Sequence, residues 1–247
     1  ALQVIGVENG INKIAGMYIL ISKEGPIFFA DTTVNIDPTV EEIVDITLLV
    51  ARTVKEYKIK PKIALLSYSN FGSNEGPDAV KMREAAKILH QNHPDLVVDG
   101  EIQANFAVNK ELNNDFFPFS MLANKSANTL IFPNLSAGNI AYKLVQEMSQ
   151  NETIGPVLLG MKKPVHVLQI GSSVREILNM ITLGVGDSAS SHSGQEATLT
   201  MLLIVNNSVP IASISSPLTG YTTDSSDLIR FDSSGSVDRA AFHVGLF

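Results

Sequence analysis

The sequence predicts an α/β protein with a mostly parallel sheet and helices on both faces. Short aliphatic runs alternate along the chain with longer segments whose apolar residues recur at helical spacing. The run 62–67 follows Pro61, and its centre, Ile63–Leu66, is entirely aliphatic, which is typical of a parallel strand buried on both faces. Residues 79–90 then carry apolar side chains at helical spacing. Such alternation indicates βαβ units and a three-layer arrangement.

The expected elements follow from this alternation and from turn signals. Strands are expected at 17–21 and 27–30, joined through a turn that contains Gly25-Pro26. A helix is expected from Asp37 as the cap and Pro38 at the first position to about residue 57. The remaining expected strands are 62–67, 96–98, 128–132, 155–159 and 165–167, and the remaining expected helices are 78–92, an irregular stretch near 103–115, 136–149 and 173–184.

A loop of small residues, from Ser67 to Pro77, connects an expected strand to an expected helix. Glycine lets the backbone approach a ligand closely, serine offers hydroxyl donors, and the first turn of a helix attracts anions through its free N–H groups and dipole. The loop therefore predicts a phosphate or anion site. Its candidate residues are Ser69, Asn70, Gly72, Ser73 and Asn74. An ordinary Gly/Ser turn between a strand and a helix remains an alternative reading.

Three further residues are expected at the same edge of the sheet. Glu101 is expected just after strand 96–98, where a carboxylate can orient a ligand hydroxyl or serve as a first-turn acid of a helix. Asn134 precedes the expected helix 136–149, and Asn139 lies near its start. Ligands of open parallel sheets bind beyond the carboxyl ends of the strands, so these residues are candidates to contact a phosphate or amide.

Composition excludes several classes of function. With 18 Lys+Arg against 25 Asp+Glu, the net charge of −7 disfavours a general nucleic-acid or anionic-membrane surface. The absence of cysteine removes disulfides, Cys-based zinc sites and thiol nucleophiles. His90 and His93 are spaced like two metal ligands, but no third ligand is evident nearby and we expect no metal site. No apolar run has the ~20 residues that cross a bilayer, so a cytoplasmic protein is expected.

Several stretches together resemble the phosphate acetyl/butyryl transferase family. They are the 67–77 loop, Asp99–Ala104, Ile131–Leu144, Ile154–Gly160 and Lys163–Gln169, so the resemblance runs from about 61 to 185. Two upstream stretches, Ala15–Ile21 and Phe28–Thr39, are similar to one branch of that family, the transferase-like C-terminal region of bacterial hybrid malic enzymes. The resemblance implies an isocitrate/isopropylmalate dehydrogenase-like fold, as in phosphate acetyltransferases.

The resemblance also bears on catalysis. Active phosphate acetyltransferases carry Ser-Arg-Gly-Cys and an aspartate four residues later, which the family uses to bind acetyl phosphate and activate the thiol of coenzyme A. The corresponding residues here are Gln169, Ile170 and Glu176. An aliphatic side chain cannot replace a guanidinium that clamps phosphate with two hydrogen bonds. Transferase catalysis is therefore expected to be absent, and Glu176 is left as the candidate catalytic residue.

The implied function is that of a module in a malic enzyme. The parent enzyme would convert malate to pyruvate and CO2 with NAD or NADP and Mg²⁺ or Mn²⁺, and this module would bind acetyl-CoA or CoA as an allosteric effector and support a homo-oligomer. The chain shows no Gly-x-Gly-x-x-Gly dinucleotide motif, so no cofactor is expected within it. The alternatives are an active phosphate acetyl/butyryltransferase and a non-catalytic scaffold fragment.

Residues 186–247 depart from the pattern of the preceding chain. They contain no lysine, are dense in serine and threonine, and lie beyond the family resemblance. We therefore expect a partial transferase-like domain at 1–185, lacking its N-terminal part and cut from a longer protein. A linker and atypical tail are expected at 186–247. The tail is either β-rich, disordered or the product of a coding irregularity.

Overall fold

The structure is a computed structural model that describes residues 5–149, 152–163, 165–167, 177–180, 183, 198–203, 212–217 and 243–246. The chain divides into two compact units, Leu2–Lys162 and a second unit that includes Lys163–Phe247. The predicted division at residue 185 stays a prediction, and each compact unit is described by itself.

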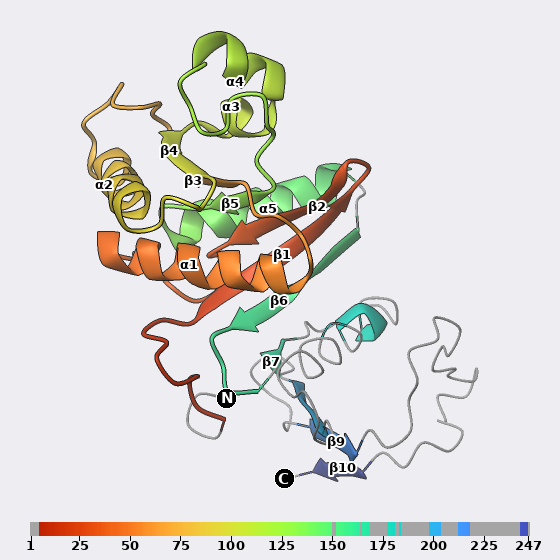
Figure 1. The fold of residues 1–247 in the computed structure, drawn as a ribbon. Helices are drawn as coiled ribbons and strands as arrows, with labels where there is room; N and C mark the ends of the chain where they lie inside the picture. The colour runs from red at the N-terminus through yellow and green to blue at the C-terminus, as the bar shows by residue number, and fades with distance from the viewer. Residues whose placement is uncertain are drawn as a thin grey trace. The chain divides into compact units, whose positions relative to one another are not determined.

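One mixed sheet organises the first unit (Figure 1). Its strands are β1 (Ala15–Ser22), β2 (Gly25–Ala30), β3 (Ile63–Leu66), β4 (Val98–Ile102), β5 (Thr129–Ile131) and β6 (Glu152–Leu159). They lie in the order β4-β3-β5-β2-β1-β6. The neighbours from β4 to β2 are parallel, whereas β1 runs antiparallel to both β2 and β6. This confirms the predicted α/β class with a mostly parallel sheet.

Helices cover both faces of this sheet. The helices are α1 (Val40–Glu56), α2 (Pro77–Asn92), α3 (Ala104–Val108), α4 (Lys110–Phe116) and α5 (Leu135–Ser149). In Figure 1, α1 crosses in front of the strands and α5 lies behind them. The core on the α5 side joins Tyr142 to alternate residues of the strands, including Tyr18, Phe29 and Leu130. Alternation along each strand fills both interfaces with apolar side chains.

The start of α1 differs from the sequence-based expectation. Thr39 caps the helix, with its hydroxyl accepting a hydrogen bond from the Glu42 amide, and the Glu42 carboxylate accepts one from the Thr39 amide. This reciprocal capping box satisfies two amide groups at once, which a cap at Asp37 does not provide. Asp37 instead forms an ion pair with Lys81 of α2.

Strand β4 begins at Val98, so it overlaps the expected strand 96–98 at that residue only, and Glu101 lies within the strand rather than after it. Leu65 of β3 pairs with Gly100, but Leu66 pairs with Ile102, so Glu101 is the extra residue of a bulge. A bulge changes the direction in which its side chain points. The glycine before it permits the close contact of the two strands, because Gly100 has a φ of 153° and a Cβ there would lie 2.6 Å from the Leu65 carbonyl oxygen.

The described part of the second unit contains short strands. They are β7 (Val165–His166), β8 (Thr198–Leu203), β9 (Ala212–Pro217) and β10 (His243–Leu246). Strand β9 pairs antiparallel with both β8 and β10. Of the predicted helix 173–184, residues 177–180 and 183 are described and are helical, while the others lie outside the described residues. Among the described helices of the whole chain, none has the length and apolar character that crossing a bilayer requires.

We predict that Gly100→Ala strongly destabilises the protein. The added Cβ meets the Leu65 backbone in a conformation that favours glycine, a combination that should cost about 3 kcal/mol in the free energy of unfolding. Urea denaturation measures this loss. Gly25→Ala is the matched control, because Gly25 also has a positive φ of 116° but nothing lies within 4 Å of a Cβ there. Equal losses in the two variants would contradict the role assigned to the contact between strands.

Candidate ligand-binding edge

The candidate site lies at the edge of the sheet where the parallel strands end. Strand β2 leads into the segment 31–37, β3 into 67–76, β4 into Gln103, and β5 into 132–134. These segments meet at one edge because their strands share a direction. Open parallel sheets bind ligands at this edge.

The loop after β3 contains a tight turn. The Ser73 amide donates to the Asn70 carbonyl oxygen at 3.0 Å, and the two residues between them have positive φ, 44° at Phe71 and 88° at Gly72. Two positive φ values at the centre of a turn are the signature of type I′. The Ser73 hydroxyl oxygen also accepts from the Asn70 amide at 3.0 Å. These contacts give the loop a defined shape.

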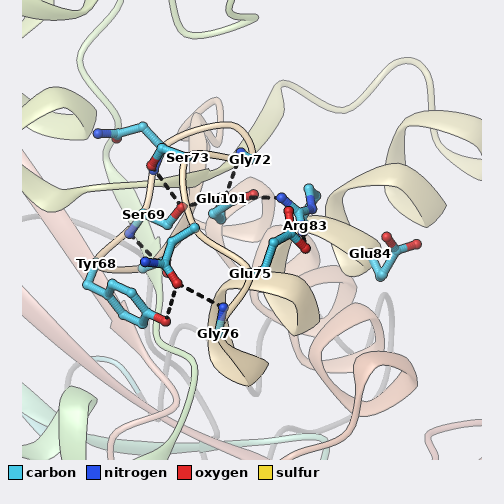
Figure 2. A network of polar contacts seen from close by, with 12 residues as sticks. Tyr68, Ser69, Gly72, Ser73, Glu75, Gly76, Arg83, Glu84 and Glu101 are labelled. Carbon is cyan, nitrogen blue, oxygen red and sulfur yellow. Dashed lines mark hydrogen bonds and ion pairs between the residues drawn. The ribbon is translucent and has the colours of Figure 1, made fainter.

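The donors of this loop converge on the carboxylate of Glu101 (Figure 2). Its Oε1 accepts from the Ser69 hydroxyl at 2.8 Å and from the Gly72 amide at 2.7 Å. The Ser69 and Ser73 hydroxyl oxygens are 3.0 Å apart, which extends the cluster. Glu101 and Ser69 are both fully buried. The donors of the loop therefore hold a carboxylate of the chain itself, and binding of a phosphate or another free anion by the loop stays a prediction.

Arg83 of α2 adds a positive charge to the cluster. Its Nη1 lies 3.9 Å from Glu101 Oε1, while its Nη2 donates to the Glu75 carboxylate at 2.8 Å. The Glu75 hydrogen bond, together with the charge of Glu101, raises the pKa of Arg83 against the opposing effect of burial. The second carboxylate oxygen of Glu101, Oε2, is buried and has no hydrogen-bond partner among the described residues. The arrangement therefore satisfies Glu101 on one oxygen only.

The two loop asparagines stabilise the neighbouring backbone. The Asn74 side-chain oxygen accepts from the Gly76 amide at 2.9 Å and from the Tyr68 hydroxyl at 3.1 Å. Asn70 accepts from the Gln103 amide at 2.8 Å and so ties the loop to the end of β4. Gly76 is the cap residue of α2 and provides no side-chain cap. The first turn of α2 is therefore left to interact with solvent or with a ligand.

Asn134 and Asn139 are not part of the Glu101 cluster. Asn134 accepts from the Ala137 amide at 3.0 Å, which caps α5, and donates to the Asp78 carboxylate at 3.2 Å. The Asn139 side chain donates to the Thr32 carbonyl oxygen at 3.3 Å. Both asparagines connect the start of α5 to neighbouring loops. Glu176 lies outside the described residues.

Asp31, at the end of β2, is a residue that the sequence analysis missed. It is 3% exposed, and its Oδ1 accepts from the amides of Gly16, Thr33 and Val34 at 2.8–3.1 Å. An aspartate whose carboxylate accepts hydrogen bonds from the backbone amides that follow it commonly stabilises a turn. The signal in the sequence is an aspartate followed by polar Thr-Thr immediately after a strand.

Lys81 connects the starts of the two helices on one face of the sheet. Its Nζ lies 2.7 Å from Asp37 before α1 and 3.1 Å from Asp78 in α2. Burial acts to lower the pKa of Lys81, but the hydrogen bonds and charges of the two aspartates outweigh it and the pKa is raised. Lys81 and Arg83, both in α2, are therefore each engaged by carboxylates of the chain.

The chain is an α/β protein whose mostly parallel sheet carries a donor-rich loop at its carboxyl edge, the edge at which open parallel sheets commonly bind ligands. Residues 1–185 match the family model described as phosphate acetyl/butaryl transferase, and the chain belongs to this family. The family resemblance drawn from the sequence is thereby confirmed.

Known relatives include two kinds of enzyme. The chain is 43% identical over 184 residues to the NADP-dependent malic enzyme of Escherichia coli (strain K12), covering 74% of this chain and 24% of that enzyme. It is 37% identical over 191 residues to the phosphate acetyltransferase of Clostridium acetobutylicum, covering 74% of this chain and 57% of that enzyme. A phosphotransacetylase structure from Streptococcus pyogenes is similar with a TM-score of 0.71 and 38% identity, over 76% of this chain and 58% of that one. The chain thus spans about a quarter of the malic enzyme that it matches.

We predict that Glu101→Gln destabilises the protein by about 2 kcal/mol, the scale expected when buried hydrogen bonds lose their charge assistance and an unpaired donor is buried. The amide places a second polar group in the buried position of Oε2 and removes the charge that faces Arg83. Chemical denaturation measures the change. Glu75→Gln is the control, since Glu75 also contacts Arg83 but is exposed, and its stability should stay close to that of the wild type. A neutral effect of Glu101→Gln would show that its carboxylate does not stabilise the loop.

Proposed function

We propose that the carboxyl edge of this sheet binds the phosphate groups of coenzyme A or acetyl-CoA, and that the chain acts as the transferase-like module of a malic enzyme. The observation that carries the proposal is the start of α2. This helix begins without a side-chain cap, directly after a loop whose shape is set by Glu101. Exposed residues of the loop, Ser73 and Asn74, flank this position. A phosphate group can supply the missing cap to the helix.

The charges of the site support a role in binding rather than in transfer. An acyl phosphate carries a concentrated negative charge that transferases stabilise with cations. Among the described residues of the cluster, Arg83 and Lys81 are already paired with carboxylates. The sequence places Ile170 where the active family members have arginine, and this residue lies outside the described ranges. The loss of one such electrostatic group typically lowers the rate of an enzyme by a factor of about 10²–10³.

The proposal extends to the parent protein and its assembly. Acetyl-CoA would act as an allosteric effector of a cytoplasmic homo-oligomer, while NAD or NADP and Mg²⁺ or Mn²⁺ would bind in other parts of the malic enzyme. The similarity to phosphotransacetylase structures supports an isocitrate/isopropylmalate dehydrogenase-like fold as part of the same proposal. An active phosphate acetyl/butyryltransferase is the second candidate, favoured by the similarity to the clostridial enzyme. A non-catalytic scaffold fragment is the third.

We predict that the chain binds coenzyme A and acetyl-CoA, and that Ser73→Ala weakens both by about tenfold, because the substitution removes a hydroxyl that braces Asn70 and Ser69. Isothermal titration calorimetry measures the dissociation constants. The melting temperature of the variant serves as the control for folding. Equal affinity in the two proteins would remove the loop from the site, and no binding by either would favour the scaffold.

A turnover assay separates the malic-enzyme module from the transferase. We expect no appreciable formation of acetyl-CoA from acetyl phosphate and CoA, either by this chain or by a version extended upstream. Replacing Gln169, Ile170 and Glu176 with Ser, Arg and Asp should raise the rate of the extended protein, because the guanidinium restores a phosphate clamp. Wild-type turnover within tenfold of the ~10 s⁻¹ typical of enzymes would decide for the transferase.

A further inference from the structure

A second concave site lies at the opposite edge of the sheet, where the parallel strands begin. It is a cavity of about 770 Å³ between the β1–β2 turn, the start of β3, the α3–α4 junction and the segment that leads into β5. Its volume falls in the range of about 300–1,000 Å³ that is usual for small-molecule sites. The whole cavity is formed by the first compact unit.

Lysines distinguish this cavity from the rest of the surface. We call it the lysine groove, after the four lysines that line it: Lys23, Lys62, Lys110 and Lys125. Glu24 is the single acidic residue among those that line it. Four positive charges therefore share one concave surface in a chain whose net charge is −7.

In the part of the chain that the structure describes, none of these four lysines has a carboxylate partner, which they share with other lysines such as Lys55 and Lys143 but not with five basic residues elsewhere in the chain. Elsewhere Lys13, Arg52, Lys81, Arg83 and Lys87 each form an ion pair with a carboxylate. Among the described residues, none of the four groove lysines lies within ion-pair distance of a carboxylate. Lys125 Nζ donates to the Met121 carbonyl oxygen at 2.9 Å, which leaves its charge uncompensated. Unpaired like charges in a concavity repel one another and concentrate the field on an incoming anion.

The wall of the groove is held in place by backbone contacts. The Asn128 side-chain oxygen accepts from the Lys62 amide at 2.8 Å, and its nitrogen donates to the Lys60 carbonyl oxygen at 3.0 Å. The start of β3 is thereby fixed against the segment that leads into β5. The side chains of Asn124 and Ser126 add uncharged polar groups to the lining. The groove thus combines a fixed wall with flexible ammonium groups.

We propose that the lysine groove binds a small polyphosphate, with the diphosphate or triphosphate group as the element recognised. Ammonium groups are compact charges on flexible stems, so several of them can adjust to phosphate groups of variable geometry. Four unpaired cations match the charge of a diphosphate or triphosphate. The volume of the groove limits the ligand to a small molecule. The site is separate from the loop at the carboxyl edge and does not depend on the function proposed for that loop.

Calorimetry with inorganic pyrophosphate tests the proposal. We expect the wild-type chain to bind it, and we expect the triple variant Lys23→Gln, Lys62→Gln, Lys110→Gln to bind at least tenfold more weakly. The affinity of the wild type should fall as salt concentration rises, more steeply than that of the variant. A matched triple variant, Lys55→Gln, Lys87→Gln, Lys143→Gln, removes the same charge from α1, α2 and α5 and should bind as the wild type does.

Two further binding measurements locate the pyrophosphate site and identify the kind of molecule that supplies the phosphate groups. In a Ser73→Ala background, which removes the hydroxyl assigned to the carboxyl-edge loop, the three groove substitutions should still weaken pyrophosphate binding at least tenfold. Loss of pyrophosphate binding on Ser73→Ala alone, with binding kept in the groove variant, would overturn the proposal in favour of the carboxyl-edge loop. Tighter binding of ATP than of pyrophosphate would identify a nucleotide as the source, and equal binding would identify the phosphate groups alone. Absence of pyrophosphate and ATP binding at millimolar concentration, or equal affinity in both triple variants, would refute the groove as a polyphosphate site.

Discussion

The carboxylate of Glu101 is the interaction on which the candidate site depends. A charge that is fully buried needs hydrogen-bond donors, and Glu101 obtains them from Ser69 and Gly72. The bulge in β4 places this side chain beneath the loop, and the contact of Gly100 with β3 makes the bulge possible. The shape of the loop and the uncapped start of α2 follow from this one arrangement.

The sequence predicts the order of elements well because apolar periodicity reports directly on burial in a sheet or helix. Most strands and helices of the first unit were therefore predicted with small errors at their ends, whereas β4 shares only Val98 with its expected range. The position of a single residue within a strand is harder to predict. Glu101 is the extra residue of a bulge, and the bulge depends on pairing with β3, more than thirty residues earlier in the chain. The Thr39–Glu42 capping box was visible in the sequence, but Asp37-Pro38 offered a competing start signal.

The candidate residues illustrate the same limit. The loop after β3 is local in sequence, so its composition predicts donors and a turn, and the structure contains both. The partners of Asn134 and Asn139 lie 56 and 107 residues away, so only the folded chain shows that these side chains connect α5 to other loops. Asp31 was missed because most of its partners are backbone amides, and the polar residues that follow it are a weak signal for that arrangement.

The two edges of the sheet differ in how their charges are used. At the carboxyl edge, the cations of the cluster pair with carboxylates of the chain, which fixes loops and helix starts in place. At the amino edge, the lysines lie without acidic partners around a cavity. Although its net charge is −7, the protein therefore has a preorganised loop at one edge of the sheet and a positive field that attracts anions at the opposite edge.

Amide hydrogen exchange at Gly72, followed by NMR, tests the role of Glu101 most directly. Gly72 is exposed, so its amide would exchange rapidly unless the buried carboxylate holds it. We predict that exchange at Gly72 in the wild type is at least tenfold slower than in an unstructured peptide, and that Glu101→Ala removes this protection while the amides of β3 remain protected. Exchange of Gly72 at the unstructured rate in the wild type, or unchanged protection in the variant, would contradict this prediction.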